Sequence, residues 1–395
     1  MTKDTERLMT AIWISGLMKS SGMINKQMER LLEHFGSAAK IFYADNDDVI
    51  QTADVSDKVR VKLDKYLNDD VMKEISELEA VRCIKHIGKE LFHCVYINEK
   101  DYPFLLKQIQ APPSVLFYCS SDSIGIMNDK FCAAVIGTRN LSHYGEQATR
   151  KIVKGFNHLD CVIISGLARG IDSIAHQTAL EENIKTCAVI GCGVDVVYPP
   201  ENAGLMKRIM EQGIVISECP PGSPPVKSYF PARNRIISGL SKCIIVVEAA
   251  SESGTMITAA QAGDQGRDVY AVPGSIFSPR STGTNKLIAD GACVVTSARD
   301  IINNYRYKFG ERVITEEIGI AKTSYDNNDD RIEKFRYLIS LLDNCERSFD
   351  ELVRLSGLDT GILSETLSEC EISGYIGFEN GRYFLTIQDK SSISN

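Results

Sequence analysis

The chain lacks the long apolar segments that mark membrane proteins and secreted precursors. No apolar run approaches the roughly 20 residues that a transmembrane helix needs, and "CIIVV" at 243–247 has the length of a strand. The first residues, "MTKDTERLMTAIWISGLMK", carry two acids and no long apolar core, so we do not expect a signal peptide. We therefore expect a cytoplasmic protein with no membrane partner.

The chain also lacks the C-x-x-C spacing of redox and zinc motifs. Its 12 cysteines stand singly among apolar neighbours, as small hydrophobes do in a reducing compartment. One local cluster comprises Cys83, His86, His93 and Cys94. A strand would point the adjacent His93 and Cys94 to opposite faces, which makes a zinc site unfavourable. We expect no metal and no cofactor.

Motifs for covalent catalysis and nucleotide binding are missing as well. There is no G-x-S-x-G and no G-x-x-x-x-G-K-[ST], and Gly191-Cys192-Gly193 lacks the third glycine of a dinucleotide fingerprint. The acids that follow strands, Asp195, Glu218 and Glu248, lie on separate loops. We expect them to cap loops or pair with arginines, and we expect no catalytic residues.

Charge is unevenly distributed along the 395 residues, of which 44% are hydrophobic and 24% charged. The formal net charge of −8 argues at first against nucleic acid as a partner. Residues 131–300, however, hold 16 of the 44 Lys and Arg and 15 of the 52 Asp and Glu. The middle of the chain is therefore neutral, and the acidity belongs to the flanks.

The middle of the chain shows the alternation of a doubly wound α/β fold. Apolar runs of strand length are separated by helical stretches of about a dozen residues, which is βαβ spacing and predicts a mostly parallel sheet. The predicted strands are "FCAAVIG", "CVIIS", "TCAVIG", "GIVIS", "CIIVVE", "DVYAVPG" and "ACVVT".

Apolar spacing predicts three further regions around this domain, which spans residues 91–305. Residues 1–90 predict a small helical module, similar to helix–hairpin–helix or sterile-alpha-motif-like modules, although the usual G-I-G turn is absent. Within the domain, residues 91–120 predict an extended lead-in with a turn at the two prolines. Residues 306–330 are polar and predict a linker. Residues 331–390 show three helices and a hairpin, the winged-helix order.

The third helix of this winged-helix module carries the wrong charge for reading duplex DNA. Residues 360–373 include Glu365, Glu369 and Glu371 and no Lys or Arg. Acidic side chains repel the phosphates that flank a major groove. We expect the module to contact protein instead of duplex DNA.

The loops after the predicted strands are rich in glycine, hydroxyl and arginine. In an open α/β sheet these loops meet at one edge, where ligands bind. One such loop suits a single phosphate, whereas several together suit a chain of phosphates. An aromatic residue among cations adds a stacking face, the physics of single-strand binding. The candidate DNA-binding residues are Gly137, Thr138, Arg139, Ser165, Gly166, Leu167, Ala168, Arg169, Gly170, Lys227, Phe230, Arg233, Asn234, Arg235, Ser253, Gly254 and Thr255.

Several of these residues have a purely structural alternative. Arg139 and Arg169 could be ordinary surface arginines. Arg233 and Arg235 stand two apart at a helix start, so they diverge and one of them could pair with an acid. Phe230 suits a core as well as a stacking face. His176, on the helix after the glycine loop, is more simply a buried structural group than a base.

These motifs resemble the DprA family, the DNA-processing proteins also called Smf. The matching stretches are "GTR", "SGLARGIDSIAH", "GCGVDVVYP", "FPARNRIISGLS", "ESGTMITAAQAGDQGRDVYAVPG" and "GTNKLIADGA". The resemblance implies an extended Rossmann fold that binds single-stranded DNA, forms a homodimer and helps load the RecA recombinase in natural transformation. Single-strand binding protein is a further candidate partner.

The resemblance also assigns roles to particular residues. It implies that Arg139 grips phosphate and that Lys227 and Phe230 are the family's basic residue and stacking aromatic. The loop Ser165–Gly170 and the segment Ser253-Gly254-Thr255 would supply backbone donors. For the dimer surface it points to the segment that contains Asn285, Leu287 and Ile288.

Two other classes of function compete with DNA binding. The first is a nucleotide-binding or nucleotide-hydrolysing Rossmann enzyme related to the phosphoribohydrolases, which carry P-G-G-x-G-T-x-x-E. Here "VPGS" and "SGTMITA" stand apart, and Ile257, Thr258 and Ala259 occupy the region where the catalytic Glu is needed, so hydrolysis is not expected. The second, a protein scaffold without DNA contact, leaves the clustered arginines and glycines unexplained.

Overall fold

The structure is a computed structural model that divides into two compact units. The first unit is Met1–Asn304 and the second is Tyr305–Asn395. The described residues are 2–88, 91–157, 159–305, 337–338, 341–342, 346–372, 376–379 and 381–385. The predicted linker at 306–330 lies outside them. No helix of the described part is long and apolar enough to cross a membrane, and no group of three or more metal-binding side chains occurs there.

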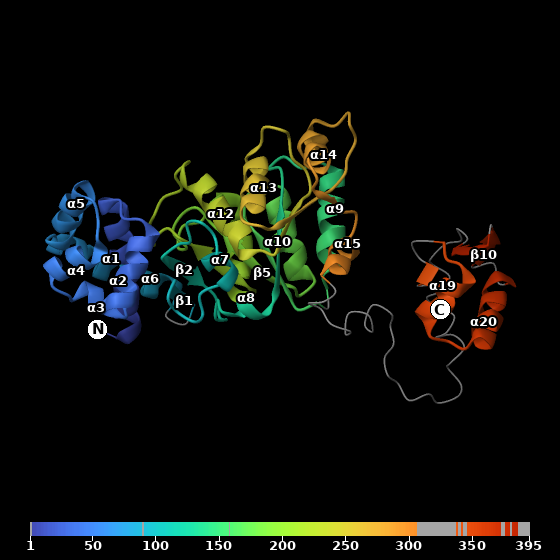
Figure 1. The fold of residues 1–395 in the computed structure, drawn as a ribbon, viewed down its shortest axis with the longest axis horizontal. Coiled ribbons are helices and arrows are strands. Elements are labelled where there is room, and N and C mark those ends of the chain that lie inside the picture. The colour runs from blue at the N-terminus through green and yellow to red at the C-terminus, as the bar shows by residue number, and fades with distance from the viewer. Residues whose placement is uncertain are drawn as a thin grey trace. The chain divides into compact units, whose positions relative to one another are not determined.

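The first unit begins with helices, coloured blue in Figure 1. They pack around a buried tryptophan. Trp13 has no exposed surface, and its ring lies edge-on to Phe42 with 5.0 Å between centroids. The hydroxyl of Tyr66 donates to the carbonyl of Trp13 at 3.0 Å. The helices are α1 (Lys3–Ser21), α2 (Asn25–Phe35), α3 (Ala38–Phe42), α4 (Asn46–Ala53), α5 (Asp57–Leu67) and α6 (Asp70–Ile87).

These helices share a hydrophobic core with the sheet that follows. The buried side chains of α1–α6 belong to the same apolar cluster as those of the strands. At the junction, the Arg7 guanidinium donates to the carbonyl of Cys94 at 3.1 Å, and the hydroxyls of Thr10 and Tyr96 lie 3.1 Å apart. The helices α1–α6 are therefore packed onto the sheet.

A nine-stranded sheet is the centre of the first unit, with the order β1-β2-β6-β5-β4-β3-β7-β8-β9. The strands from β6 to β9 in this order are parallel to one another, and β1 and β2 join antiparallel beside β6. The strands are β1 (Phe92–Tyr96), β2 (Val115–Cys119), β3 (Phe131–Ile136), β4 (Cys161–Ser165), β5 (Lys185–Val189), β6 (Ile214–Ser217), β7 (Cys243–Val246), β8 (Asp268–Ala271) and β9 (Cys293–Val294).

The observed strands agree with the strands predicted from the sequence. All seven predicted apolar runs form the strands β3 to β9, and the mostly parallel α/β sheet is confirmed. The prediction for residues 91–120 was incomplete, because the segment forms two strands that pair with the sheet instead of a plain lead-in. The β2–β6 pair joins residues about 100 positions apart. A pattern of neighbouring residues cannot predict such a long-range strand pair.

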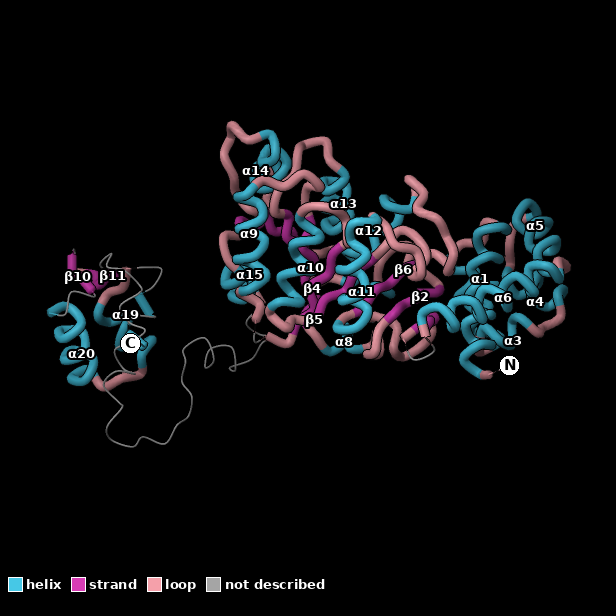
Figure 2. Tube along the Cα trace, turned by 180° about the vertical axis from the view of Figure 1, so that it is seen from behind, coloured by secondary structure: helices cyan, strands magenta, loops and turns pink. Residues whose placement is uncertain are grey.

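Helices cover the sheet in two groups (Figure 2). In one group α9 packs on α10 and α15, and α10 packs on α11, whereas in the other α12 packs on α13 and α7. Right-handed crossovers on either side of β3 send the connections to opposite faces. The helices are α7 (Phe104–Lys107), α8 (Ile126–Asp129), α9 (His143–Lys154), α10 (Ile171–Glu181), α11 (Ala203–Gln212), α12 (Tyr229–Leu240), α13 (Gly254–Asp264), α14 (Thr282–Ala289) and α15 (Ala298–Asn304), with 3₁₀ turns at Pro200–Asn202 and Pro279–Ser281.

Cysteines contribute to the buried face of these strands. Cys132, Cys161, Cys187 and Cys243 are buried, and burial raises the pKa of each thiol. Cys293 on the edge strand β9 is exposed. The buried thiols act as small apolar side chains, as the sequence predicted.

The described part of the second unit includes the helices α19 and α20 and a hairpin. The helices are α19 (Phe349–Ser356) and α20 (Thr360–Ile372), and β10 (Ile376–Glu379) pairs antiparallel with β11 (Arg382–Leu385). A capping box opens α19, since Ser348 N–H donates to Glu351 at 2.7 Å and Glu351 N–H donates to Ser348 Oγ at 3.3 Å. Gly357, with φ +63°, ends α19.

Candidate nucleic-acid interface

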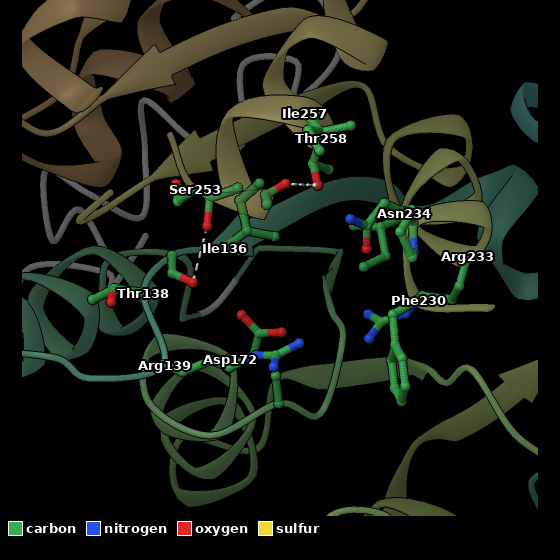
Figure 3. A pocket seen from close by; sticks show the side chains of 16 residues that line it. Ile136, Thr138, Arg139, Asp172, Phe230, Arg233, Asn234, Ser253, Ile257 and Thr258 are labelled. Carbon is green, nitrogen blue, oxygen red and sulfur yellow. Dashed lines mark hydrogen bonds between the residues drawn. The ribbon is translucent and has the colours of Figure 1, made fainter. Parts of the chain in front are cut away.

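A cavity of about 420 Å³ opens at the C-terminal ends of the parallel strands. Figure 3 shows Thr138 and Arg139 on one side of it and Phe230 and Asn234 on the other. The elements that contribute are the loop after β3, the start of α10, and the starts of α12 and α13. The predicted residues that line this cavity are Gly137, Thr138, Arg139, Ala168, Phe230, Arg233, Asn234, Ser253, Gly254 and Thr255.

A second, smaller cavity shares a wall with the first. It is lined by the glycine loop after β4 and by Tyr198, and Arg139, Phe230 and Arg233 border both cavities. The Phe230 ring is partly buried and lies 5.3 Å from the ring of Tyr198, centroid to centroid. The predicted residues in this second lining are Arg139, Gly166, Leu167, Ala168, Arg169, Phe230 and Arg233.

The arginines of the edge differ strongly in their surroundings. Arg139 is exposed at the rim of both cavities. Arg169 is also exposed, but it forms an ion pair with Glu201, and this hydrogen bond raises the pKa of Arg169. Arg235 donates to both carboxylate oxygens of Glu218, at 2.7 and 2.6 Å, and lines neither cavity. One arginine of the predicted pair is thus held by an acid.

Arg233 is the buried arginine of the site, with 7% of its surface exposed. Burial lowers its pKa to about 10, and the nearby Asp172 carboxylate opposes the change. Asp172 is equally buried; burial raises its pKa, and Arg233 counteracts that shift. Arg233 Nε has no hydrogen-bond partner among the described residues. The cavity wall therefore contains a buried guanidinium whose charge is balanced by the neighbouring Asp172 carboxylate.

The backbone donors of the glycine loop are partly used within the protein. Gly166 N–H donates to the Asp172 carboxylate at 3.1 Å. On the neighbouring loop after β3, Thr138 N–H likewise donates to the carbonyl of Glu248 at 2.8 Å. The sequence predicts that the glycine loop holds an external anion, whereas its first glycine holds an acid of the chain itself. Sequence reasoning missed Asp172, although an acid in the first turn of a helix after a glycine loop is a recognisable signal.

Gly170 joins this loop to the loop after β3. Its φ of +78° is unfavourable for other residues, and a Cβ there would lie 2.3 Å from the carbonyl oxygen of Thr138. The two loops therefore pack backbone against backbone. This contact brings Arg139 next to the start of α10.

Two predicted residues of the glycine loop point into the protein. Ser165 is buried and its hydroxyl donates to the carbonyl of Val135 at 2.6 Å, and Leu167 is fully buried. Lys227 is exposed and belongs to neither cavity lining. Ser165 and Leu167 therefore support the backbone of the glycine loop from inside the protein.

His176 lies beneath the site as a structural group. It is fully buried, and its Nδ1 lies 2.7 Å from Thr186 Oγ1, whose proton is donated to the carbonyl of Ile163. Nδ1 is therefore the donor in this pair. Burial, helped by the charge of Arg233, lowers the pKa of His176 to about 3, so the ring is neutral at physiological pH.

The strand-end acids have the structural roles that the sequence predicts. Glu248 accepts from the N–H of Ser142 at 2.9 Å and from its hydroxyl at 2.5 Å, at the start of α9. Glu218 pairs with Arg235, and Asp195 accepts from Gly222 N–H at 2.8 Å. None of the three is paired with a second carboxylate in the described structure, as general acid–base chemistry on two carboxylates requires.

The sequence and fold match one family of proteins. The family model described as DNA recombination-mediator protein A matches residues 93–306. DNA processing protein DprA of Streptococcus pneumoniae is 37% identical over 299 residues, which are 73% of this chain and 96% of that protein. DprA of Bacillus subtilis is 43% identical over 205 residues, 52% of this chain and 68% of that protein.

Solved structures agree with the sequence comparison. The X-ray structure of Streptococcus pneumoniae DprA matches with a TM-score of 0.62 and 35% identity, covering 74% of this chain and 96% of that one. A Helicobacter pylori DprA structure, described for its single-stranded DNA binding mode, matches with a TM-score of 0.50 and 28% identity, covering 55% and 97%. This chain belongs to the DNA recombination-mediator protein A family, as its motifs indicated.

Proposed function

We propose that this protein binds single-stranded DNA along the two cavities at the C-terminal edge of its sheet. The observation that carries the proposal is that an exposed guanidinium, Arg139, and a partly buried aromatic ring, Phe230, both line the two cavities. A cation beside an aromatic face combines phosphate neutralisation with base stacking. The single-stranded DNA binding described for the Helicobacter pylori relative supports this proposal.

The larger biological role rests on the family. We propose a non-enzymatic mediator that receives single-stranded DNA and assists loading of the RecA recombinase in DNA uptake and recombination. Its homodimer surface would include Asn285, Leu287 and Ile288 of α14. Leu287 and Ile288 are partly exposed beside the edge strand β9, whose Val294 is 48% exposed, which suits a surface that a second copy covers.

We propose the corresponding architecture for the chain. Residues 91–305 would form an extended Rossmann domain that follows a helical module at 1–90. A linker at 306–330 would lead to a winged-helix module at 331–390. The order of α19, α20 and the β10–β11 hairpin supports the last assignment.

A bound nucleotide is the rival occupant, since the larger cavity measures about 420 Å³. Ile257 and Thr258 line it where a hydrolytic enzyme of the related class needs a glutamate. The glutamate that the related enzymes need for hydrolysis is therefore not at this position. The rival proposal is thus a protein that binds a nucleotide without hydrolysing it.

The deciding experiment is fluorescence anisotropy with an oligothymidine and a duplex of equal length over a salt series. We expect preference for the single strand, a steep salt slope, and weaker binding by Arg139→Ala. Arg208→Ala, an exposed arginine on α11, is the matched control and should bind like wild type. If wild type binds neither DNA, the proposal is wrong and a free nucleotide becomes the ligand to test.

A further inference from the structure

A third cavity, of about 790 Å³, lies between the helical module and the sheet. Its lining comes from the end of α1, the connection to α2, the loop after β6 and the start of α12. Arg233 lines this cavity as well as the first two, and Gly191 lines it together with the second. The three cavities therefore follow one another along the start of α12.

Two consecutive aromatic residues of α12 line neighbouring cavities in this row. Phe230 borders the first two cavities, and Tyr229 borders the third. The Tyr229 hydroxyl accepts a hydrogen bond from Lys19 Nζ at 2.7 Å, and the same ammonium lies 5.4 Å from the centre of the ring. Lys19 of α1 is thus held against Tyr229, the residue directly before Phe230.

The charge of the third cavity is positive. Its carboxylate, Glu218, is engaged by both hydrogen bonds from Arg235, so Lys19 and Lys26 remain as exposed cations in the lining. Arg233, 7% exposed, also faces this cavity, with Nε unpartnered among the described residues. The surplus positive charge of this lining that solvent can reach therefore comes from the two exposed lysines.

We propose that the single strand continues past Phe230, over Tyr229, and onto the connection between α1 and α2, where Lys19 and Lys26 neutralise further phosphates. This inference rests on the proposed function, because it extends the same DNA track. Continuity with the first two cavities favours a polyanionic strand over an acidic protein segment as the occupant. The helical module then acts in DNA binding in addition to packing on the sheet.

The extension predicts an effect that depends on DNA length. The full-length Lys19→Ala/Lys26→Ala variant is compared with wild type on oligothymidines of about 6 and about 20 nucleotides, the first near the lower end of the usual site sizes and the second beyond their upper end. We expect about tenfold weaker binding of the longer DNA and a salt slope reduced by about 1.4, the value for two lost phosphate contacts on a single strand. Binding of the shorter DNA should change less than twofold.

A charge-matched control comes from the same module. Lys58→Ala/Lys62→Ala removes two exposed lysines from α5, outside the cavity lining, and should leave both affinities unchanged. The inference is overturned if the Lys19/Lys26 variant binds the long DNA like wild type, or loses affinity equally for both lengths. If wild type binds no oligothymidine of either length, it is the proposed function that fails.

Discussion

Arg82 on α6 donates a hydrogen bond across 2.6 Å to the Asp195 carboxylate, which lies on the loop after β5. The Asp195 side chain is only 2% exposed, and its other oxygen accepts the N–H of Gly222 at 2.8 Å. One buried carboxylate therefore joins the helical module to two loops of the strand edge. This makes the module a part of the support beneath the proposed DNA track.

Replacing Arg82 with alanine leaves that buried carboxylate without its charged partner. We expect Arg82→Ala to lower the free energy of unfolding by about 1–2 kcal/mol, because an acceptor in a buried position loses its donor. Urea denaturation measures the change, with Arg60→Ala, an exposed arginine on α5, as the control. Equal midpoints for the two variants would show that the contact does not stabilise the module.

Phe230 should contribute to DNA affinity through its ring. Removing one base–aromatic stack costs about 1–3 kcal/mol, so Phe230→Ala should weaken oligothymidine binding by about 5- to 150-fold. Phe230→Trp keeps an aromatic face and should retain most of the affinity. Anisotropy titrations decide the matter, and wild-type affinity in the alanine variant would mean that Phe230 only fills space.

Gly170 tests the contact between the two loops. Gly170→Ala places a Cβ 2.3 Å from the carbonyl oxygen of Thr138 at a φ of +78°, so we expect a loss of at least about 2 kcal/mol in unfolding free energy. DNA binding should weaken too, because the loop that carries Arg139 must shift.

The control for this variant is a glycine without such contacts. Gly204 lies in α11 with no atom within 4 Å of a Cβ, and Gly204→Ala should be neutral or stabilising by up to about 1 kcal/mol. Thermal unfolding of both variants gives the comparison. A stable, DNA-binding Gly170→Ala protein would contradict the close packing of the loops.

His176 predicts a pH dependence of stability. Its pKa is about 3 in the folded chain and 6.5 in its ordinary state, so below pH 6.5 the unfolded chain binds the additional proton. Stability should therefore fall as the pH drops from 6.5 toward 3, by at most about 1.4 kcal/mol per pH unit from this group. His176→Gln should flatten the profile measured by denaturation between pH 7 and 4.5, and an unchanged slope would contradict the assignment.

The second unit should not add affinity for duplex DNA. The α20 helix carries Glu365 and Glu371 as exposed acids and no Lys or Arg. A chain ending at Asn304 should therefore bind the duplex within about twofold of the full-length protein, as measured by fluorescence anisotropy at the lowest salt concentration of the series. A clear loss of duplex binding on truncation would assign this unit a DNA contact.

Local patterns predicted the parallel strands because each is a continuous apolar run of the required length. They did not predict that β1 and β2 extend the sheet, since that pairing depends on β6, about 100 residues away. The same limit applies to the site. Arg139 and Phe230 line the same two cavities, as their places after strand ends suggest. The partner of Arg235, by contrast, is Glu218 on a different loop, a pairing that local sequence does not predict.

Cysteine chemistry gives the chain a ready reporter. The thiolate is the reactive form of cysteine, and the buried strand thiols stay protonated because burial raises their pKa. Among the described cysteines, Cys293 is the exposed one, and it stands on the edge strand beside the proposed dimer surface. A maleimide dye will thus label that edge ahead of the other described thiols, and its labelling rate against protein concentration reports when a second copy covers β9.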